Sequence, residues 1–188
     1  MRKHLSLMLL LLLLITCTAC GQRQTVQRMA ADRITQAESV AQLQEVSDLI
    51  VVFTPESQEN ILSYFSDGNV SGGYTRTTGT VSQVLKGEPP EQLVITEECY
   101  LVDNVLWTQG GYLPMQEGES YLLFLTVYDR DSVYFPTELE KGKYPLTDEP
   151  LTASDSADAW EVYVIEADDL HDYQNWYQQI AALYPELF

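Results

Sequence analysis

The chain has 188 residues, 45% of them hydrophobic and 20% charged, which is typical of one folded domain. Ten lysines and arginines stand against 28 aspartates and glutamates, so the formal net charge is −18. This charge argues against a nucleic-acid binder and against electrostatic docking on anionic lipid, since both need a basic face. Three cysteines and two histidines leave little material for a disulfide framework or a metal centre.

The first 20 residues have the pattern of a secretory signal. Arg2 and Lys3 precede an apolar run over 5–15, which is shorter than the about 20 residues that a membrane-spanning helix needs. The following residues, Cys17-Thr18-Ala19-Cys20-Gly21, resemble the lipobox of bacterial lipoproteins. The resemblance implies a signal peptide over 1–19, a diacylglyceryl group on Cys20, and a lipid anchor on the extracytoplasmic face of the cell membrane. Cleavage before Cys17 and an ordinary secretory signal are the alternatives.

After this cleavage the chain retains one internal cysteine, Cys99, so a disulfide within the domain is excluded and the fold must depend on its hydrophobic core. Residues 20–36 are polar and are expected to form a tether, partly helical. Its arginines, Arg23, Arg28 and Arg33, either lie near the lipid headgroups or are solvated linker charges. The domain itself is expected over 37–188.

A short helix is expected over 39–46, and strand patterns follow it. The first, 49–54, is closed by Pro55, and 60–66 can continue it before a loop over 67–73. Further strands are expected at 74–86, at 92–99, at 121–128 as the central strand, and at 133–135, 141–146 and 160–166. Residues 129–132 are expected to join a hairpin, and a loop with Gly110, Gly111 and Pro114 leads into the central strand.

The last element has the periodicity of an amphipathic helix. Its apolar face comprises Leu170, Tyr173, Tyr177, Ile180 and Tyr184. Asp168 is the expected N-cap, Pro185 ends the helix, and the apolar face is expected to pack on a sheet. The fold class is therefore mainly β with flanking helices, built as a small barrel or a strongly bent sheet.

A series of segments resembles the OB-fold-like domains of the netrin and tissue-inhibitor-of-metalloproteinase type, and resembles more closely a branch of small secreted and lipid-anchored bacterial proteins. The segments are 47–52, 80–87, 93–95, 118–125 and 142–144. The resemblance implies a small five-stranded OB-like Greek-key barrel. In the inhibitors, the amine and carbonyl of an N-terminal cysteine chelate the zinc of the peptidase. Here the equivalent residue would be Cys20, which the lipid modifies, and the inhibitors' disulfides are absent, so both features oppose this role.

Catalytic arrangements receive little support from the residues. His171 lies among Asp168, Asp169 and Asp172, which favours a solvated first helical turn over a member of a triad. Cys99 follows two glutamates, which raise the pKa of a thiol, so it is expected to be a buried small apolar side chain.

Acidic residues could also supply oxygen ligands to Ca²⁺, but none has the spacing of an EF-hand, and we expect no metal site and no cofactor. The acidic groups considered are Asp129 with Asp131, Asp155 with Asp158, and Asp168 with Asp169. Carboxylates are too common in this chain for any one pair to indicate a glycosidase.

Aromatic residues in the expected loop are the remaining indication of function. Tyr100, Trp107 and Tyr112 could bind a protein or a glycan, and Trp107 and Tyr112 could instead cover the end of the barrel. The sequence thus favours a non-enzymatic, lipid-anchored binding module of the cell envelope, preferably on a Gram-positive surface. The alternative is an inhibitor of an extracellular peptidase, and a carboxylate-dependent hydrolase comes third.

Overall fold

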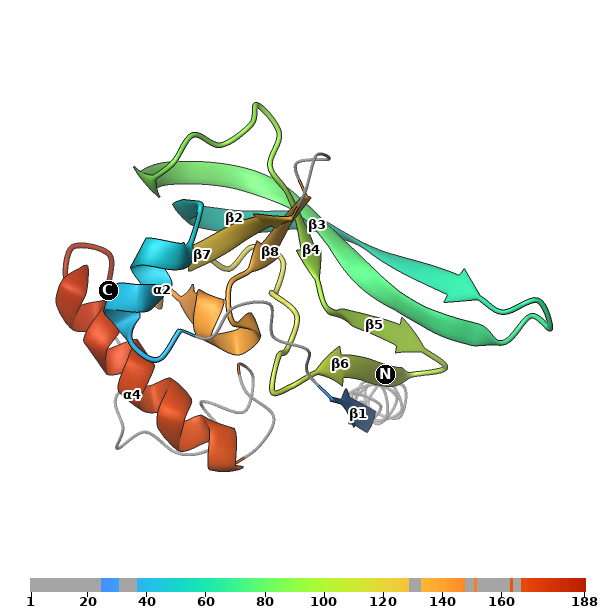
Figure 1. The fold of residues 1–188 in the computed structure, drawn as a ribbon. Helices are drawn as coiled ribbons and strands as arrows, with labels where there is room; N and C mark the ends of the chain where they lie inside the picture. The colour runs from blue at the N-terminus through green and yellow to red at the C-terminus, as the bar shows by residue number, and fades with distance from the viewer. Residues whose placement is uncertain (1–24, 31–36, 129–132, 148–150, 152–162, 164–166) are drawn as a thin grey trace, which may run out of the picture.

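The structure is a computed structural model that describes residues 25–30, 37–128, 133–147, 151, 163 and 167–188. Within these residues strands predominate, with the α-helices α2 and α4 near the two ends of the described chain (Figure 1). In chain order the elements are β1 (Thr25–Met29), α2 (Val40–Val46), β2 (Leu49–Tyr64), β3 (Val70–Lys86), β4 (Val94–Glu97), β5 (Cys99–Val102), β6 (Val105–Gln109), β7 (Tyr121–Tyr128), β8 (Val133–Pro136), the 3₁₀ helix η1 (Leu139–Gly142), β9 (Lys143–Pro145) and α4 (Ala167–Leu183). The predicted class, mainly β with flanking helices, is confirmed.

The larger sheet curls until its first strand meets a later one. Its strand order is β2-β3-β4-β8-β7, and β7 returns to pair with β2 from Leu49↔Leu125 to Phe53↔Tyr121. The pairing of β4 with β8 is parallel, through Ile95↔Tyr134, and the other pairings in this circuit are antiparallel. Strand β9 extends the sheet beside the start of β7.

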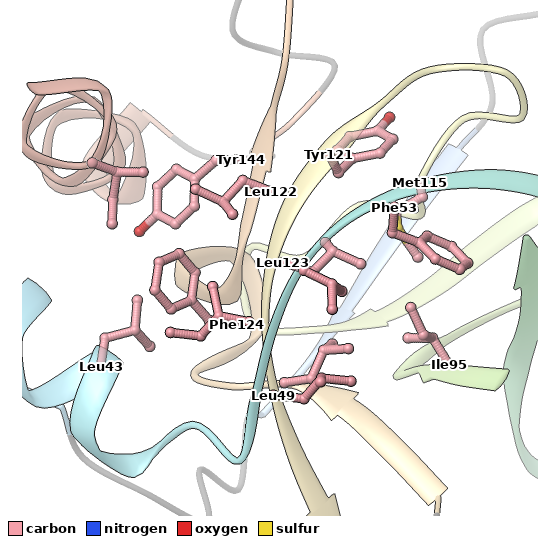
Figure 2. Packing of buried hydrophobic residues seen from close by; sticks show 14 of the residues in the cluster. Leu43, Leu49, Phe53, Ile95, Met115, Tyr121, Leu122, Leu123, Phe124 and Tyr144 are labelled. Carbon is pink, nitrogen blue, oxygen red and sulfur yellow. The ribbon is translucent and has the colours of Figure 1, made fainter. Parts of the chain in front are cut away.

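Strand β7 lies at the centre of the core, as predicted. Its residues 121–125 are all buried, because one face lies against the interior of the curled sheet and the other against the helices. Figure 2 shows Phe124 and Tyr144 on the side of the helices, and Leu123 with Phe53 and Ile95 on the opposite side.

Helix α4 packs on the sheet through its apolar face, as predicted. The rings of Tyr173 and Tyr144 stack with centroids 5.7 Å apart, and the Tyr173 hydroxyl donates to the carbonyl of Lys143 at 2.7 Å. The helix begins at Ala167, so Asp168 lies inside the first turn and is not the N-cap. Helix α2 is capped by Ser39, whose hydroxyl accepts from the backbone N–H of Gln42.

Strands β2 and β3 run on beyond the curled sheet as a long two-stranded arm (Figure 1). The expectation that Pro55 ends the first strand is wrong. The ladder shifts register between Pro55 and Ser57, and this irregularity accommodates a residue that has no N–H to donate. The expected loop over 67–73 is shorter than predicted, because β3 already begins at Val70 and the turn occupies 65–69.

A second, small sheet with the order β1-β6-β5 lies beside the arm. The predicted strand over 92–99 divides at Glu98 into β4 and β5, and much of the expected loop is the β5–β6 hairpin. Its turn residues Asp103 and Asn104 have φ of 49° and 64°, which these two residue types tolerate better than most. Residues 25–29 of the expected tether form β1, which runs parallel to β6, so this part is a strand and not a helix.

The remaining differences lie in the last third of the chain. The expected strand over 141–146 is η1 followed by the short β9. The turn over 129–132 lies outside the described residues, but the strands that it was expected to join, β7 and β8, do pair antiparallel. The expected strand over 160–166 lies outside them as well, except for Tyr163, which is in a turn.

Candidate functional site

A pocket of about 680 Å³ lies on the outer face of β3, β4 and β8. On β4, Ile95 and Glu97 are fully buried, whereas Val94 and Thr96, with Glu98 directly after the strand, line the pocket. The lining combines aromatic and aliphatic groups with side-chain amides, hydroxyls and charged groups. The complete lining is Gly73, Tyr74, Arg76, Pro90, Gln92, Val94, Thr96, Glu98, Gln109, Val133 and Phe135.

Arg76 is the basic residue of this lining, and its partner holds it loosely. Its Nη1 lies 3.4 Å from Oε2 of Glu59 on the neighbouring strand, and the two side chains are 46% and 65% exposed. An exposed ion pair of this length contributes little to stability. The guanidinium can therefore leave Glu59 for a hydrogen-bond acceptor in the pocket at small cost.

Two of the three predicted partner-binding aromatics stack next to this pocket. Tyr100 and Trp107, on β5 and β6, have parallel rings with centroids 6.4 Å apart. Tyr100 is itself largely buried, because its ring lies over Gly73 of β3, where a Cβ would come within 2.9 Å of the ring. Trp107 is half-buried. Within this pair, Trp107 is thus the ring with surface to offer.

The third predicted aromatic, Tyr112, is placed differently. It is 1% exposed, and its hydroxyl donates to Oε2 of Glu97 at 2.5 Å. Burial, with the nearby Glu97 carboxylate, raises the pKa of Tyr112 well above its ordinary value. Tyr112 is therefore buried in a small apolar cluster with Cys99, Leu106 and Leu139, and it offers no surface to a partner.

Glu97 is the centre of a buried polar cluster. Besides Tyr112, its carboxylate accepts from the backbone N–H of Met115 at 2.7 Å, from Nε2 of Gln58 at 3.0 Å, and from the hydroxyl of Thr77. The four donors come from three parts of the chain, so the carboxylate ties β2, β3 and the 110–116 segment to β4. The side chain has no exposed surface, so solvent and substrates do not reach it in this conformation.

Lys143 lies in the same cluster and is also fully buried. Its Nζ donates to the carbonyl of Leu113 and lies 4.4 Å from the ring centroid of Tyr112 and 5.7 Å from that of Tyr121. Burial lowers the pKa of Lys143 to about 8, although the Glu97 carboxylate opposes this shift. The cluster therefore joins buried strands through hydrogen bonds and holds a carboxylate and an ammonium group in the same interior.

Among the other candidate residues, the structure describes the side chains of Cys99, His171 and Asp172. Cys99 is buried, as predicted, and desolvation together with Glu97 raises the pKa of its thiol. His171 is exposed at the start of α4, where its Nε2 lies 3.3 Å from Nδ2 of Asn175. The acidic pairs at 129–131 and 155–158, and the lipidation residue Cys20, lie outside the described residues, and so do the side chains of Asp168 and Asp169.

Two properties of the described part of the chain bear on metals and membranes. Its histidine, cysteine and acidic side chains do not gather in groups of three or more that could hold a metal ion. Its helices are all too short or too polar to cross a membrane. Comparison with protein-family models and with curated proteins finds no match.

Sequence reasoning missed the Glu97–Lys143 cluster and the pocket. A signal for Glu97 was present, because Ile95, Glu97 and Cys99 alternate at the spacing of one strand face. For the pocket there was none, since its lining comes from separate segments between Gly73 and Phe135 that only the fold brings together.

Proposed function

We propose that this chain is a lipid-anchored binding module of the cell envelope, attached through Cys20, which binds a neutral oligosaccharide in the pocket over β3, β4 and β8. The observation that carries the proposal is the lining of that pocket. Tyr74 and Phe135 offer faces for sugar rings, and Gln92, Thr96 and Gln109 offer hydrogen-bond partners for hydroxyl and acetamido groups. The net charge of −18 disfavours a polyanionic ligand.

The strand order supports an OB-like barrel as part of this proposal. In the circuit β2-β3-β4-β8-β7, strands β3 and β4 are second and third in chain order. In OB-folds the face of the second and third strands is the one that binds oligosaccharides and oligonucleotides. This is an argument from fold analogy, and the pocket chemistry carries the greater weight.

A binding role agrees with the distribution of carboxylates around the site. The pocket lining includes one, Glu98, whereas Glu97, Glu138 and Glu140 are buried and do not line it. A carboxylate-dependent hydrolase needs two carboxyl groups facing the same bond. The inhibitor alternative rests on the fold resemblance alone, and a lipid on Cys20 would oppose it.

Binding can be measured on the full chain, extracted in mild detergent, with a β-1,4-linked N-acetylglucosamine tetramer as the probe. We expect saturable binding that Tyr74→Ala weakens about tenfold or more, the usual effect of removing an aromatic anchor. Tyr64→Ala is the matched control, because Tyr64 is a tyrosine of the same arm and lies outside the pocket.

Two results would contradict the proposal. One is the absence of binding to the tetramer, and the other is equal binding by the Tyr74→Ala and Tyr64→Ala variants. Crosslinking on intact cells tests the competing ligand class, because one reproducible protein captured through the Trp107 surface would replace the glycan by a protein partner.

A further inference from the structure

The tip of the β2–β3 arm carries two exposed aromatic residues. Tyr64 is 60% and Phe65 is 59% exposed, and they are adjacent in the chain. The tip has a defined conformation, since the N–H of Phe65 donates to the carbonyl of Asn69 at 2.8 Å, and Asp67 accepts from the backbone and side chain of Asn69. Two adjacent exposed aromatic side chains on a hydrogen-bonded turn at the end of a projection are a candidate contact surface.

The arm is braced against the small sheet close to its tip. The side-chain amide of Asn60 donates to the carbonyl of Leu101 at 2.9 Å and accepts from the N–H of Leu101 at 2.8 Å. Tyr64 is four positions beyond Asn60 on the same strand, so the tip projects about 13 Å past this brace.

The start of β1 lies at the same end of the molecule. Thr25 pairs with Val105, Val105 pairs with Val102, and Val102 adjoins the braced Leu101. Because β1 is parallel to β6, which runs from its turn back toward the larger sheet, the chain before Thr25 leaves at the end from which the arm projects (Figure 1).

The anchor cysteine is close to this point in the chain. Cys20 precedes Thr25 by five positions, which span at most about 18 Å when fully extended. A lipid on Cys20 therefore holds the β1 end of the domain next to the bilayer surface. The length by which the tip projects past the Asn60 brace is similar to the length of chain between Cys20 and Thr25, so the tip can reach that surface.

We propose that the Tyr64–Phe65 tip rests in the headgroup region of the membrane to which Cys20 is anchored, so that the domain is held at two points. The inference rests on the lipid anchoring proposed above. Tyrosine and phenylalanine suit this interface, where an aromatic ring meets the apolar boundary. The anchor keeps the tip near the surface, so a weak contact is sufficient to orient the domain.

The charge of the tip sets the depth and the lipid preference of this contact. Asp67 lies two positions beyond Phe65 in the turn, and its carboxylate stays in the hydrated headgroup layer. The contact is therefore shallow, and it is weakened by anionic lipid, in contrast to a polybasic anchor.

The test uses the full chain, processed in a bacterium and reconstituted in phosphatidylcholine vesicles, with the lipid on Cys20 verified by intact mass. An NBD fluorophore is attached to Phe65→Cys, and to Glu88→Cys as the control at the opposite, barrel end of β3. Cys99 is buried and does not compete for the label. We expect a blue shift of the emission at 65 and quenching by doxyl-labelled lipid, both reduced when phosphatidylglycerol is added, and neither effect at 88.

The other outcomes overturn the inference in distinguishable ways. A lipidated, vesicle-bound chain whose probe at 65 is as water-exposed as the one at 88 refutes the tip contact and leaves the anchor standing. A chain without lipid on Cys20 refutes the anchoring and this inference together. A blue shift at 65 that grows with protein concentration without vesicles shows that a second copy covers the tip, which also overturns it.

Discussion

The buried Glu97–Lys143 cluster allows the energetic role of two charges to be tested by a double-mutant cycle. Both side chains are fully buried, and the Glu97 carboxylate acts on the pKa of Lys143. Glu97→Gln preserves the shape of the side chain but leaves the Lys143 ammonium without this compensating charge. Glu97→Gln also places an amide where the carboxylate accepts four hydrogen bonds, and a buried donor left without its acceptor costs about 1–3 kcal/mol, so we expect the free energy of unfolding to fall by about 3–5 kcal/mol.

Lys143→Met should cost less, because the carboxylate that remains still accepts from Tyr112, Gln58, Thr77 and the backbone of Met115. The Lys143→Met variant still loses the contacts of Nζ with the rings of Tyr112 and Tyr121, so its free energy of unfolding should fall somewhat. In the double variant, the penalty for an uncompensated ammonium disappears. We therefore expect the sum of the losses in unfolding free energy of the two single variants to exceed the loss of the double variant by about 1–3 kcal/mol.

The measurement is urea unfolding followed by tryptophan fluorescence. The original chain, the two single variants and the double variant must give the same slope of unfolding free energy against urea concentration for their stabilities to be compared. The exposed pair Arg76 and Glu59, with its 3.4 Å separation, is the matched control, and its cycle should yield a coupling of less than about 1 kcal/mol. Losses at Glu97 and Lys143 that simply add, within about 0.5 kcal/mol, would refute the electrostatic coupling.

Three further predictions concern pH, packing and capping. The pH prediction uses a Cys99→Ala background, because folding raises the pKa of the Cys99 thiol and its titration would oppose that of Lys143. In this background the free energy of unfolding should rise by about 1 kcal/mol from pH 7 to pH 9. The reason is that the pKa of Lys143 falls from 10.5 to about 8 on folding, so the unfolded chain binds more protons in this window; adding Lys143→Met should flatten the curve. Gly79→Ala should lower the melting temperature measurably by calorimetry, because its Cβ would lie 2.1 Å from the carbonyl oxygen of Thr54, and an unchanged value would contradict this contact. Ser39→Ala should cost about 1 kcal/mol in urea unfolding, as the loss of an N-cap does, while Ser39→Asp should retain most of the stability.

The sequence predicts elements well where one local pattern is sufficient to specify them. Residues 121–128 lack charges and are rich in large apolar side chains, and they form the central strand. The spacing of Tyr173, Tyr177 and Ile180 repeats with the turn of a helix, and Ser39 stands one residue before the first turn of α2. In each case the deciding information lies within one or two helical turns or one strand.

The errors occur where a distant partner overrides the local pattern. Pro55 predicts the end of a strand, but the pairing of β2 with β3 shifts register after Pro55 and the strand continues. Asp103 and Asn104 read as loop residues, although such a pair also favours a hairpin turn with two positive φ angles. Tyr112 reads as a loop aromatic, and its burial depends on Glu97, a residue that composition places on the surface.

The pairing of β1 with β6 also determines how the molecule bears mechanical load. A pull on the chain before Thr25, directed along the strand axis, drags β1 lengthwise past β6, because the chain leaves β1 at the outer end of a parallel ladder. The hydrogen bonds from Thr25 to Met29 then resist the force together instead of opening one after another. Tension from this side is delivered to the β5–β6 hairpin before it reaches the core strands β2 and β7.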